Sequence, residues 1–193
     1  MEVGREYASG AFSAASAREV AVPTAILLLT LIVPERPVGI GEAVPVALEM
    51  RNVSDRPVWV TGVLDGSEEG IRYPHYLSFV SRRGDTVAAP PPPEDPLFSP
   101  LRLADFRLLR PGESFDPTRA DGGAAYLPLA TFANFRPDAP GVYEFSITFS
   151  TESAAPDDWL GRFGQDAERA LVLERIAEVP RLTVSARAEV TVR

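Results

Sequence analysis

The sequence of 193 residues contains no cysteine, no lysine and only one histidine. Without cysteine the chain can form no disulfide bond, and it can supply neither a thiolate nucleophile nor a thiolate ligand for a metal. The single histidine, His75, excludes metal centres that need several imidazole ligands. We therefore expect no metal centre of these kinds and no bound cofactor.

Positive charge is also in short supply, because 19 basic residues, all arginine, stand against 27 acidic residues and leave a formal net charge of −8. A negative chain is not attracted to a phosphate backbone, and no basic run with interleaved aromatic residues offsets this. We expect no nucleic-acid partner. The use of arginine without lysine is typical of GC-rich genomes and indicates a bacterial source.

Long hydrophobic runs are scarce. The most apolar run, residues 25–33, is too short to span a bilayer comfortably, so we expect no membrane span and interpret the run as a buried first strand. Glu2 and Glu6 precede it and Pro34 follows it, which does not fit a signal peptide. Residues 1–21 are small and polar and are predicted to form a flexible arm. The chain as numbered is expected to be cytoplasmic, or exported if a leader was removed, so its localisation stays open.

Short runs that alternate with period two are what the sequence does contain. In residues 139–149 a Pro-Gly turn leads into a segment whose alternate positions are aromatic or aliphatic, from Tyr143 to Phe149. A second Pro-Gly turn lies at residues 111–112, and the 19 prolines and 14 glycines suit many short strands. We predict a mainly β fold, an antiparallel β-sandwich of about eight or nine strands, in a single domain of residues 22–193.

The remaining segments complete this prediction. Further strands are expected at residues 44–50, 58–63, 76–81, 86–89, 106–109, 125–129 and 182–192. Short connections predict one hairpin between the strands at 44–50 and 58–63, and another between those at 76–81 and 86–89.

Two segments interrupt the strands. Residues 88–104 contain a run of prolines, which cannot donate sheet hydrogen bonds, and are predicted to form an insertion loop. Residues 160–178 are rich in helix-forming residues and are followed by Pro180. They predict one short helix before the last strand, with an extension of that strand through residues 170–179 as the alternative.

Four pieces of this pattern resemble bacterial immunoglobulin-like sandwich domains. They are residues 44–54 followed by Pro57-Val58-Trp59-Val60, the turn at residues 109–114, Pro140-Gly141-Val142-Tyr143, and the strand at residues 185–192. The group includes cell-adhesion-related, macroglobulin-like and intracellular proteinase inhibitor-type modules. The resemblance covers about residues 25–193 and implies an immunoglobulin-like fold, but it implies no single activity because the members have unrelated tasks. The chain lacks the Cys pair of antibody domains.

Structural roles are predicted for four residues. Tyr143, two positions after Gly141, is expected to place its hydroxyl against a nearby backbone group, as in a tyrosine corner. Trp59 is expected in the core between the sheets and not on a ligand platform. Gly112 and Gly141 are expected to form the two Pro-Gly turns.

Few residues offer chemistry. His75 is the one possible general base, and a serine such as Ser78 or Ser81 would have to lie beside it for hydrolysis, but no nucleophile-elbow pattern supports this. The acidic loops at residues 65–70 and 157–158 are candidates for calcium, yet neither has the ligand spacing of an EF-hand, and we interpret both as solvated turns. The tripeptide at residues 83–85, which integrin ligands also use, is interpreted as a hairpin turn.

We therefore predict a non-enzymatic interaction module that presents loops or a sheet edge to a protein partner. The loops at residues 65–75 and 88–104 are the expected surface. If the protein works like the proteinase inhibitor-type modules that it resembles, the proline-rich loop would enter a protease cleft. The candidate partner-binding residues are Tyr73, His75, Pro91, Pro92, Pro93 and Phe98.

Two alternatives stay open. A carbohydrate- or small-ligand-binding module would use a sheet face, and it requires that Trp59, Trp159 and Tyr73 be exposed. A hydrolase that uses His75 is ranked last, and we do not expect an enzyme. The oligomeric state stays open.

Overall fold

The computed structural model describes residues 25–92, 98–161, 164–165 and 167–193. Within these ranges nine strands form antiparallel sheets, which confirms the predicted mainly β sandwich. The predicted N-terminal arm, residues 1–21, and Pro93 of the proline-rich loop lie outside the described residues. None of the helices in the described part of the chain is long and apolar enough to cross a membrane.

A four-stranded sheet makes one layer of the sandwich. Its strands, in spatial order, are β5 (Asp85–Ala88), β4 (His75–Arg82), β8 (Gly141–Ser150) and β9 (Thr183–Val192). In β8 the buried positions alternate with half-buried or exposed ones, as the period-two pattern predicted. The sheet therefore has one apolar face and one face toward solvent.

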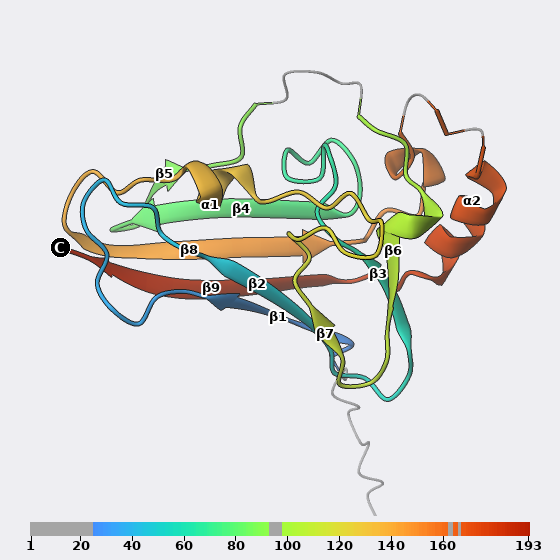
Figure 1. Cartoon of the computed structure of the whole chain (residues 1–193), viewed down its shortest axis with the longest axis horizontal. Coiled ribbons are helices and arrows are strands. Elements are labelled where there is room, and N and C mark those ends of the chain that lie inside the picture. Colours follow the sequence, from blue (N-terminus) through green and yellow to red (C-terminus); the bar gives the residue numbers. More distant parts are fainter. Residues whose placement is uncertain (1–24, 93–97, 162–163, 166) are drawn as a thin grey trace, which may run out of the picture.

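The second layer is built from shorter strands. A three-stranded sheet contains β1 (Leu27–Ile32), β2 (Ala47–Asn52) and β7 (Ser114–Phe115), and a separate pair contains β3 (Val58–Thr61) and β6 (Phe106–Leu109). Figure 1 shows β1, β2 and β7 crossing the long strands obliquely, whereas β3 and β6 lie at the end of the molecule next to α2. β1 confirms the expected first strand.

The apolar side chains between the layers form one continuous core. Met50 of the second layer and Phe145 and Phe149 of the first are fully buried. Aromatic rings also meet within the core, since Phe132 and Phe135 pack edge-on against Phe145 with centroids 5.4 and 5.6 Å away. This core fixes the long strands to which the loops described below are attached.

Helical segments lie in the connections. They are η1 (Leu103–Asp105), α1 (Ala130–Asn134), η2 (Pro156–Asp158) and α2 (Arg169–Glu178). The predicted helix before the last strand is present as α2, but it begins at Arg169 and not near residue 160. Gly164 has a positive φ of 70°, and the buried Gln165 side chain binds backbone groups of Leu101, so the helix does not extend back to these two residues.

The prediction of a strand at residues 125–129 is wrong. This segment has no regular structure and leads into α1, whose Phe132 packs in the core. The strand β7 was not predicted, because two residues are too few to show a period.

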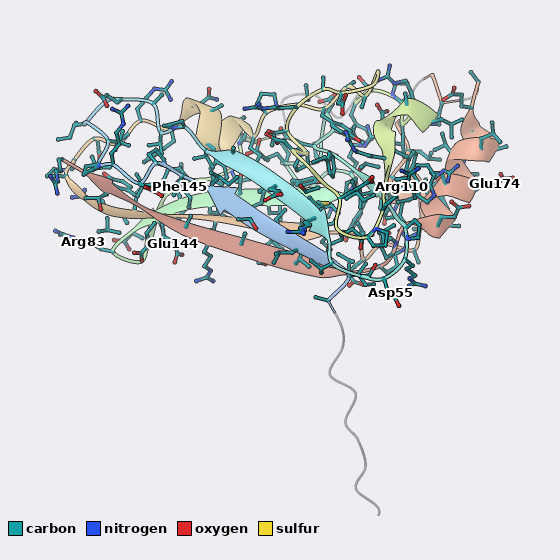
Figure 2. The ribbon with its side chains drawn as sticks, turned by 60° about the horizontal axis from the view of Figure 1, so that its bottom comes forward. Asp55, Arg83, Arg110, Glu144, Phe145 and Glu174 are labelled. Atoms are coloured by element: carbon teal, nitrogen blue, oxygen red, sulfur yellow. The ribbon has the colours of Figure 1, made fainter. Side chains whose placement is uncertain are left out.

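One predicted hairpin is present and the other is not. β4 and β5 pair through a two-residue turn in which Arg83 and Gly84 have φ of 56° and 89°. The turn lies at the end of the molecule away from α2, where Figure 2 labels Arg83, and Glu174 marks the α2 end. β2 and β3 form no hairpin, because β2 pairs with β1 and β7 whereas β3 pairs with β6.

Asn52 explains why the chain changes sheets after β2. Its side chain is fully buried, and its Nδ2 donates to the carbonyls of Arg56 (2.8 Å) and Leu109 (2.9 Å). Its Oδ1 accepts the backbone N–H of Ser54 at 2.9 Å. These bonds direct the loop toward β6 and away from a return beside β2.

The residues predicted to be structural differ in their outcome. The Tyr143 hydroxyl donates to the carbonyl of Ala139 at 2.9 Å, the kind of backbone contact that was expected of it. Gly112 and Gly141 have φ of 81° and 145°, which favour glycine in both turns. Trp59 is only half-buried, and the Arg175 guanidinium of α2 lies 3.7 Å from its ring centroid, which corrects its placement between the sheets.

Replacing Tyr143 with phenylalanine removes one hydroxyl and keeps the ring in the core. We expect Tyr143→Phe to lower the free energy of unfolding by about 1 kcal/mol, because the bond to Ala139 is lost. Tyr73→Phe is the matched control and should change it by less than about 0.5 kcal/mol, since no described residue hydrogen-bonds to the Tyr73 hydroxyl. Urea unfolding followed by circular dichroism measures both; equal values for the two variants would contradict the role of Tyr143.

Candidate functional site

Two loops that are distant in sequence enclose a cavity of about 400 Å³ at the α2 end of the sandwich. They are residues 64–72, called the 64–72 loop, and residues 98–105, called the 98–105 loop. The lining residues are Leu64, Asp65, Arg72, Ser99, Pro100, Arg102, Asp105, Ala125 and Leu127. Asp65, Arg102 and Leu127 are exposed and mark the mouth, whereas Arg72 and Asp105 are buried and line the interior.

Arg72 joins the two loops from inside. Its side chain is 1% exposed; Nη1 donates to the Ser99 carbonyl at 2.6 Å and Nη2 donates to the Trp159 carbonyl at 2.8 Å. The guanidinium also lies 5.0 Å from the ring centroid of Phe98. Burial lowers the pKa of Arg72 to about 10, so the side chain stays charged at neutral pH.

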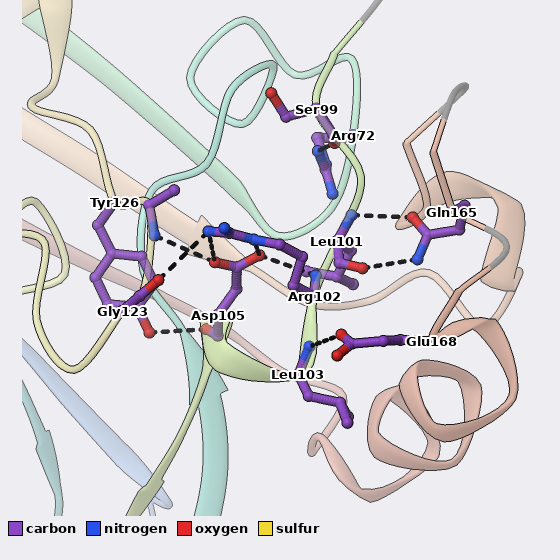
Figure 3. A network of polar contacts seen from close by, with 11 residues as sticks. Arg72, Ser99, Leu101, Arg102, Leu103, Asp105, Gly123, Tyr126, Gln165 and Glu168 are labelled. Carbon is purple, nitrogen blue, oxygen red and sulfur yellow. Dashed lines mark hydrogen bonds and ion pairs between the residues drawn. The ribbon is translucent and has the colours of Figure 1, made fainter.

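Asp105 is the buried acid of the site (Figure 3). Its carboxylate accepts the backbone N–H of Arg102 at 2.9 Å, Nη2 of Arg102 at 3.0 Å and the backbone N–H of Ala125 at 3.2 Å. The hydroxyl of Tyr126 donates to the Asp105 carbonyl at 2.8 Å. Asp105 therefore fixes the 98–105 loop to the segment that forms the far wall of the cavity.

Two side chains from the start of the α2 region hold the same loop. The buried Gln165 accepts the N–H of Leu101 at 2.9 Å through Oε1, and its Nε2 donates to the Leu101 carbonyl at 2.7 Å. Glu168 Oε2 accepts the N–H of Leu103 at 3.0 Å. Figure 3 shows both side chains reaching the loop from the side opposite Asp105. The loop is thus held from two directions.

Glu68 anchors the 64–72 loop to the sandwich. Its carboxylate is 4% exposed and accepts the Ser78 hydroxyl at 2.5 Å and the backbone N–H groups of Ala130 and Thr131 at 2.6 and 3.0 Å. Three donors satisfy the buried charge, and they belong to β4 and to the first turn of α1. Glu68 therefore faces inward and holds this loop in place, although the loop looks like a solvated acidic turn in the sequence.

Tyr73 and His75 stack on each other with ring centroids 3.8 Å apart, and both are half-buried. Burial lowers the pKa of His75, although the nearby Asp158 acts in the opposite direction. The buried Ser78 faces the core, on the other side of β4 from His75. Ser81 shares the His75 face but lies about 20 Å along the strand. The fold thus brings neither Ser78 nor Ser81 to His75.

The other candidate partner-binding residues do not share one surface with this stack. Phe98 is buried beneath Arg72, so its ring supports the 98–105 loop from inside and offers no contact surface. Pro91 and Pro92 are exposed, and Pro91 lines a second cavity of about 330 Å³ beside β5 and α1. Pro93 lies outside the described residues.

The acidic loops have protein partners for most of their carboxylates. Asp65 accepts the N–H of Ser99 at 3.3 Å, Asp157 pairs with Arg169 at 3.5 Å, and Asp158 accepts the Ser153 hydroxyl. Burial, aided by Glu68 and Asp65, raises the pKa of Glu69. Across the described ranges no three acidic or histidine side chains gather in a way that could hold a metal ion.

No protein-family model matches the chain, and no curated protein matches it in sequence. Assignment of a role therefore depends on the residues of the site. Arg72, Asp105 and Gln165 were not singled out from the sequence. Neither Arg72 nor Asp105 stands out in the sequence, because Arg72 follows Glu68 and Glu69 closely and Asp105 lies between Arg102 and Arg107. No local signal marks Gln165.

The anchoring role of the buried Asp105 can be tested by comparison with the exposed Asp121. Asp105→Ala leaves the N–H groups of Arg102 and Ala125 without their acceptor, and we expect the free energy of unfolding to fall by about 2–3 kcal/mol. Asp121→Ala removes the exposed acid that pairs with Arg107 and should cost no more than about 0.5 kcal/mol. Urea titration compares the two variants; a loss for Asp105→Ala as small as that of the control would contradict the anchoring role.

Proposed function

We propose that this protein is a non-enzymatic interaction module of the immunoglobulin-like sandwich type. In this proposal the exposed parts of the 64–72 and 98–105 loops, together with residues 125–127, bind a protein partner. These loops include parts of the surface that the sequence pattern favoured.

The observation that carries the proposal is the concentration of buried polar anchors beneath this one surface. Glu68, Arg72, Asp105 and Gln165 are each no more than 6% exposed, and each binds a backbone group of a loop or of its neighbour. Burying such groups costs stability compared with apolar packing, so they are poor devices for stability alone. They do hold loops in one conformation, which lowers the entropy cost of binding a partner.

A sheet edge is supported less well than the loops as the surface that binds the partner. β5 is a four-residue edge strand, its pairing with β4 shifts register between Val80 and Ser81, and proline follows it at residue 90. Short length, a bulge and proline are features that prevent another strand from adding to an edge. The proposal therefore assigns the partner to the loops.

Carbohydrate binding on a sheet face requires that Trp59, Trp159 and Tyr73 be exposed, and the structure does not meet this requirement. Trp159 is fully buried, Trp59 is covered by Arg175, and Tyr73 is half-buried in a stack with His75. These three residues therefore form no flat exposed aromatic platform.

Affinity capture from host lysate and medium tests the proposal with two variants of matched chemistry. Leu127→Asp places a charge at the mouth of the cavity. Val142→Asp places one at the start of β8, at the end of the molecule away from α2. The side chains of Leu127 and Val142 are 42% and 51% exposed. We expect a partner whose recovery falls at least about tenfold with Leu127→Asp, equivalent to about 1.4 kcal/mol, and is unchanged with Val142→Asp.

Two outcomes would contradict the proposal. A partner lost with Val142→Asp and kept with Leu127→Asp would place the interface at the opposite end of the molecule. Absence of any specific partner for the wild-type protein in both extracts would refute the interaction module. Circular dichroism of both variants confirms that the fold is retained before the comparison is made.

A further inference from the structure

The outer face of β1 and β2, which points away from the four-stranded sheet, exposes aliphatic side chains. On β1 the residues between the buried leucines point outward, and Leu28 and Ile32 are 50% and 53% exposed. Val53, whose N–H donates to the carbonyl of Ile26 at 3.0 Å, continues the pairing beyond β2 and is 41% exposed. In Figure 2 β1 and β2 lie in front of the four-stranded sheet, so this face is turned toward the viewer.

The same face carries one acid and one base. Glu49 and Arg51 alternate with the buried residues of β2, so both side chains point outward beside the aliphatic row of β1. Arg51 is exposed and Glu49 is half-buried. Neither forms an ion pair with another residue in the described part of the chain. The face therefore offers two opposite charges, as well as aliphatic surface, to a second molecule.

A two-fold rotation makes this face complementary to itself. The β1–β2 pairing sets four levels along the face, which are Ile26 with Val53, Leu28 with Arg51, Thr30 with Glu49, and Ile32 with Ala47. A two-fold axis that lies across the strands, midway between the second and third levels, exchanges these two levels and also exchanges the first with the fourth. Each Arg51 then faces a Glu49, and the aliphatic end levels face one another.

We propose that the outer face of β1 and β2 binds a second copy of this chain in a two-fold dimer. Each Arg51 pairs with Glu49 of the second copy, and Leu28, Ile32 and Val53 cover the surroundings of the two ion pairs. This inference goes beyond the proposed function, because the face is separate from the 64–72 and 98–105 loops. Two short strands cover less than the roughly 800 Å² per partner of a standard interface, so the dimer is weak and depends on protein concentration.

Sedimentation equilibrium of the full chain tests the dimer. Salt at about 0.15 M screens the repulsion between two chains of net charge −8. We expect a monomer–dimer equilibrium with a Kd of about 10–100 µM, as befits a small interface. Leu28→Asp should weaken association at least about tenfold, because it buries an unpaired charge. Phe79→Asp is the matched control, since Phe79 is 38% exposed on the solvent face of the other layer, and it should leave the Kd unchanged.

An exchange of charges tests how the two copies are aligned. Glu49→Arg and Arg51→Glu each place like charges opposite one another, so either variant alone should dimerise at least about tenfold more weakly than the wild type. An equimolar mixture of the two variants should associate with a Kd within about threefold of the wild-type value, because every base again faces an acid. Circular dichroism of each variant confirms beforehand that the fold is retained.

Several results would overturn the inference. A wild-type protein that is monomeric up to about 1 mM would show that a different molecule or segment covers this face. A dimer that Leu28→Asp leaves intact, or that Phe79→Asp weakens as much, would have its interface elsewhere. Unchanged association of the single charge variants, or no recovery in their mixture, would refute the pairing of Arg51 with Glu49.

Discussion

Arg72 carries a full positive charge into the interior, where the carbonyl groups of Ser99 and Trp159 replace the water around its two terminal nitrogens. These carbonyls lie 27 and 87 positions away along the chain. Because removal of a guanidinium from water is costly, the two segments are held close to the charge that they solvate. The relative position of the 64–72 loop, the 98–105 loop and the region before α2 depends on this contact.

The rest of the site extends the same principle to other backbone groups. Glu68 fixes the 64–72 loop to β4 and α1, and Asp105 and Gln165 hold the 98–105 loop from two sides. β4 starts at His75, immediately after the first loop, and pairs along its whole length with β8. The 64–72 loop is thus attached to an inner strand of the four-stranded sheet, so this irregular backbone has the support of the core.

Prediction from the sequence succeeded where the pattern is local. The alternation after Gly141 defined β8, and the turn at Arg83 and Gly84 defined the β4–β5 hairpin, because both depend on neighbouring residues. The turn after Asn52 has the residues of a hairpin, yet Asn52 binds the carbonyl of Leu109, 57 positions away, and the chain changes sheets. No pattern among neighbouring residues can indicate a contact between residues that far apart in the sequence.

The candidate site was predicted only in outline, for the same reason. The 64–72 and 98–105 loops fall largely within the predicted surface, but the residues that organise them are polar and buried, and in a sequence such residues look like solvated turns. Glu68 belongs to a loop that was interpreted as a solvated acidic turn, and Phe98, predicted to be a contact residue, is covered by Arg72. Tertiary contacts, and not composition, decided both roles.

Native-state hydrogen exchange tests most directly the claim that buried polar side chains hold these loops rigid. The amides of Leu101 and Thr131, bound by Gln165 and Glu68, are expected to exchange within about tenfold of the amides of β8, because opening them requires breaking the buried network. Exchange of Leu101 and Thr131 at the rate of an unstructured peptide, while β8 stays protected, would contradict the account.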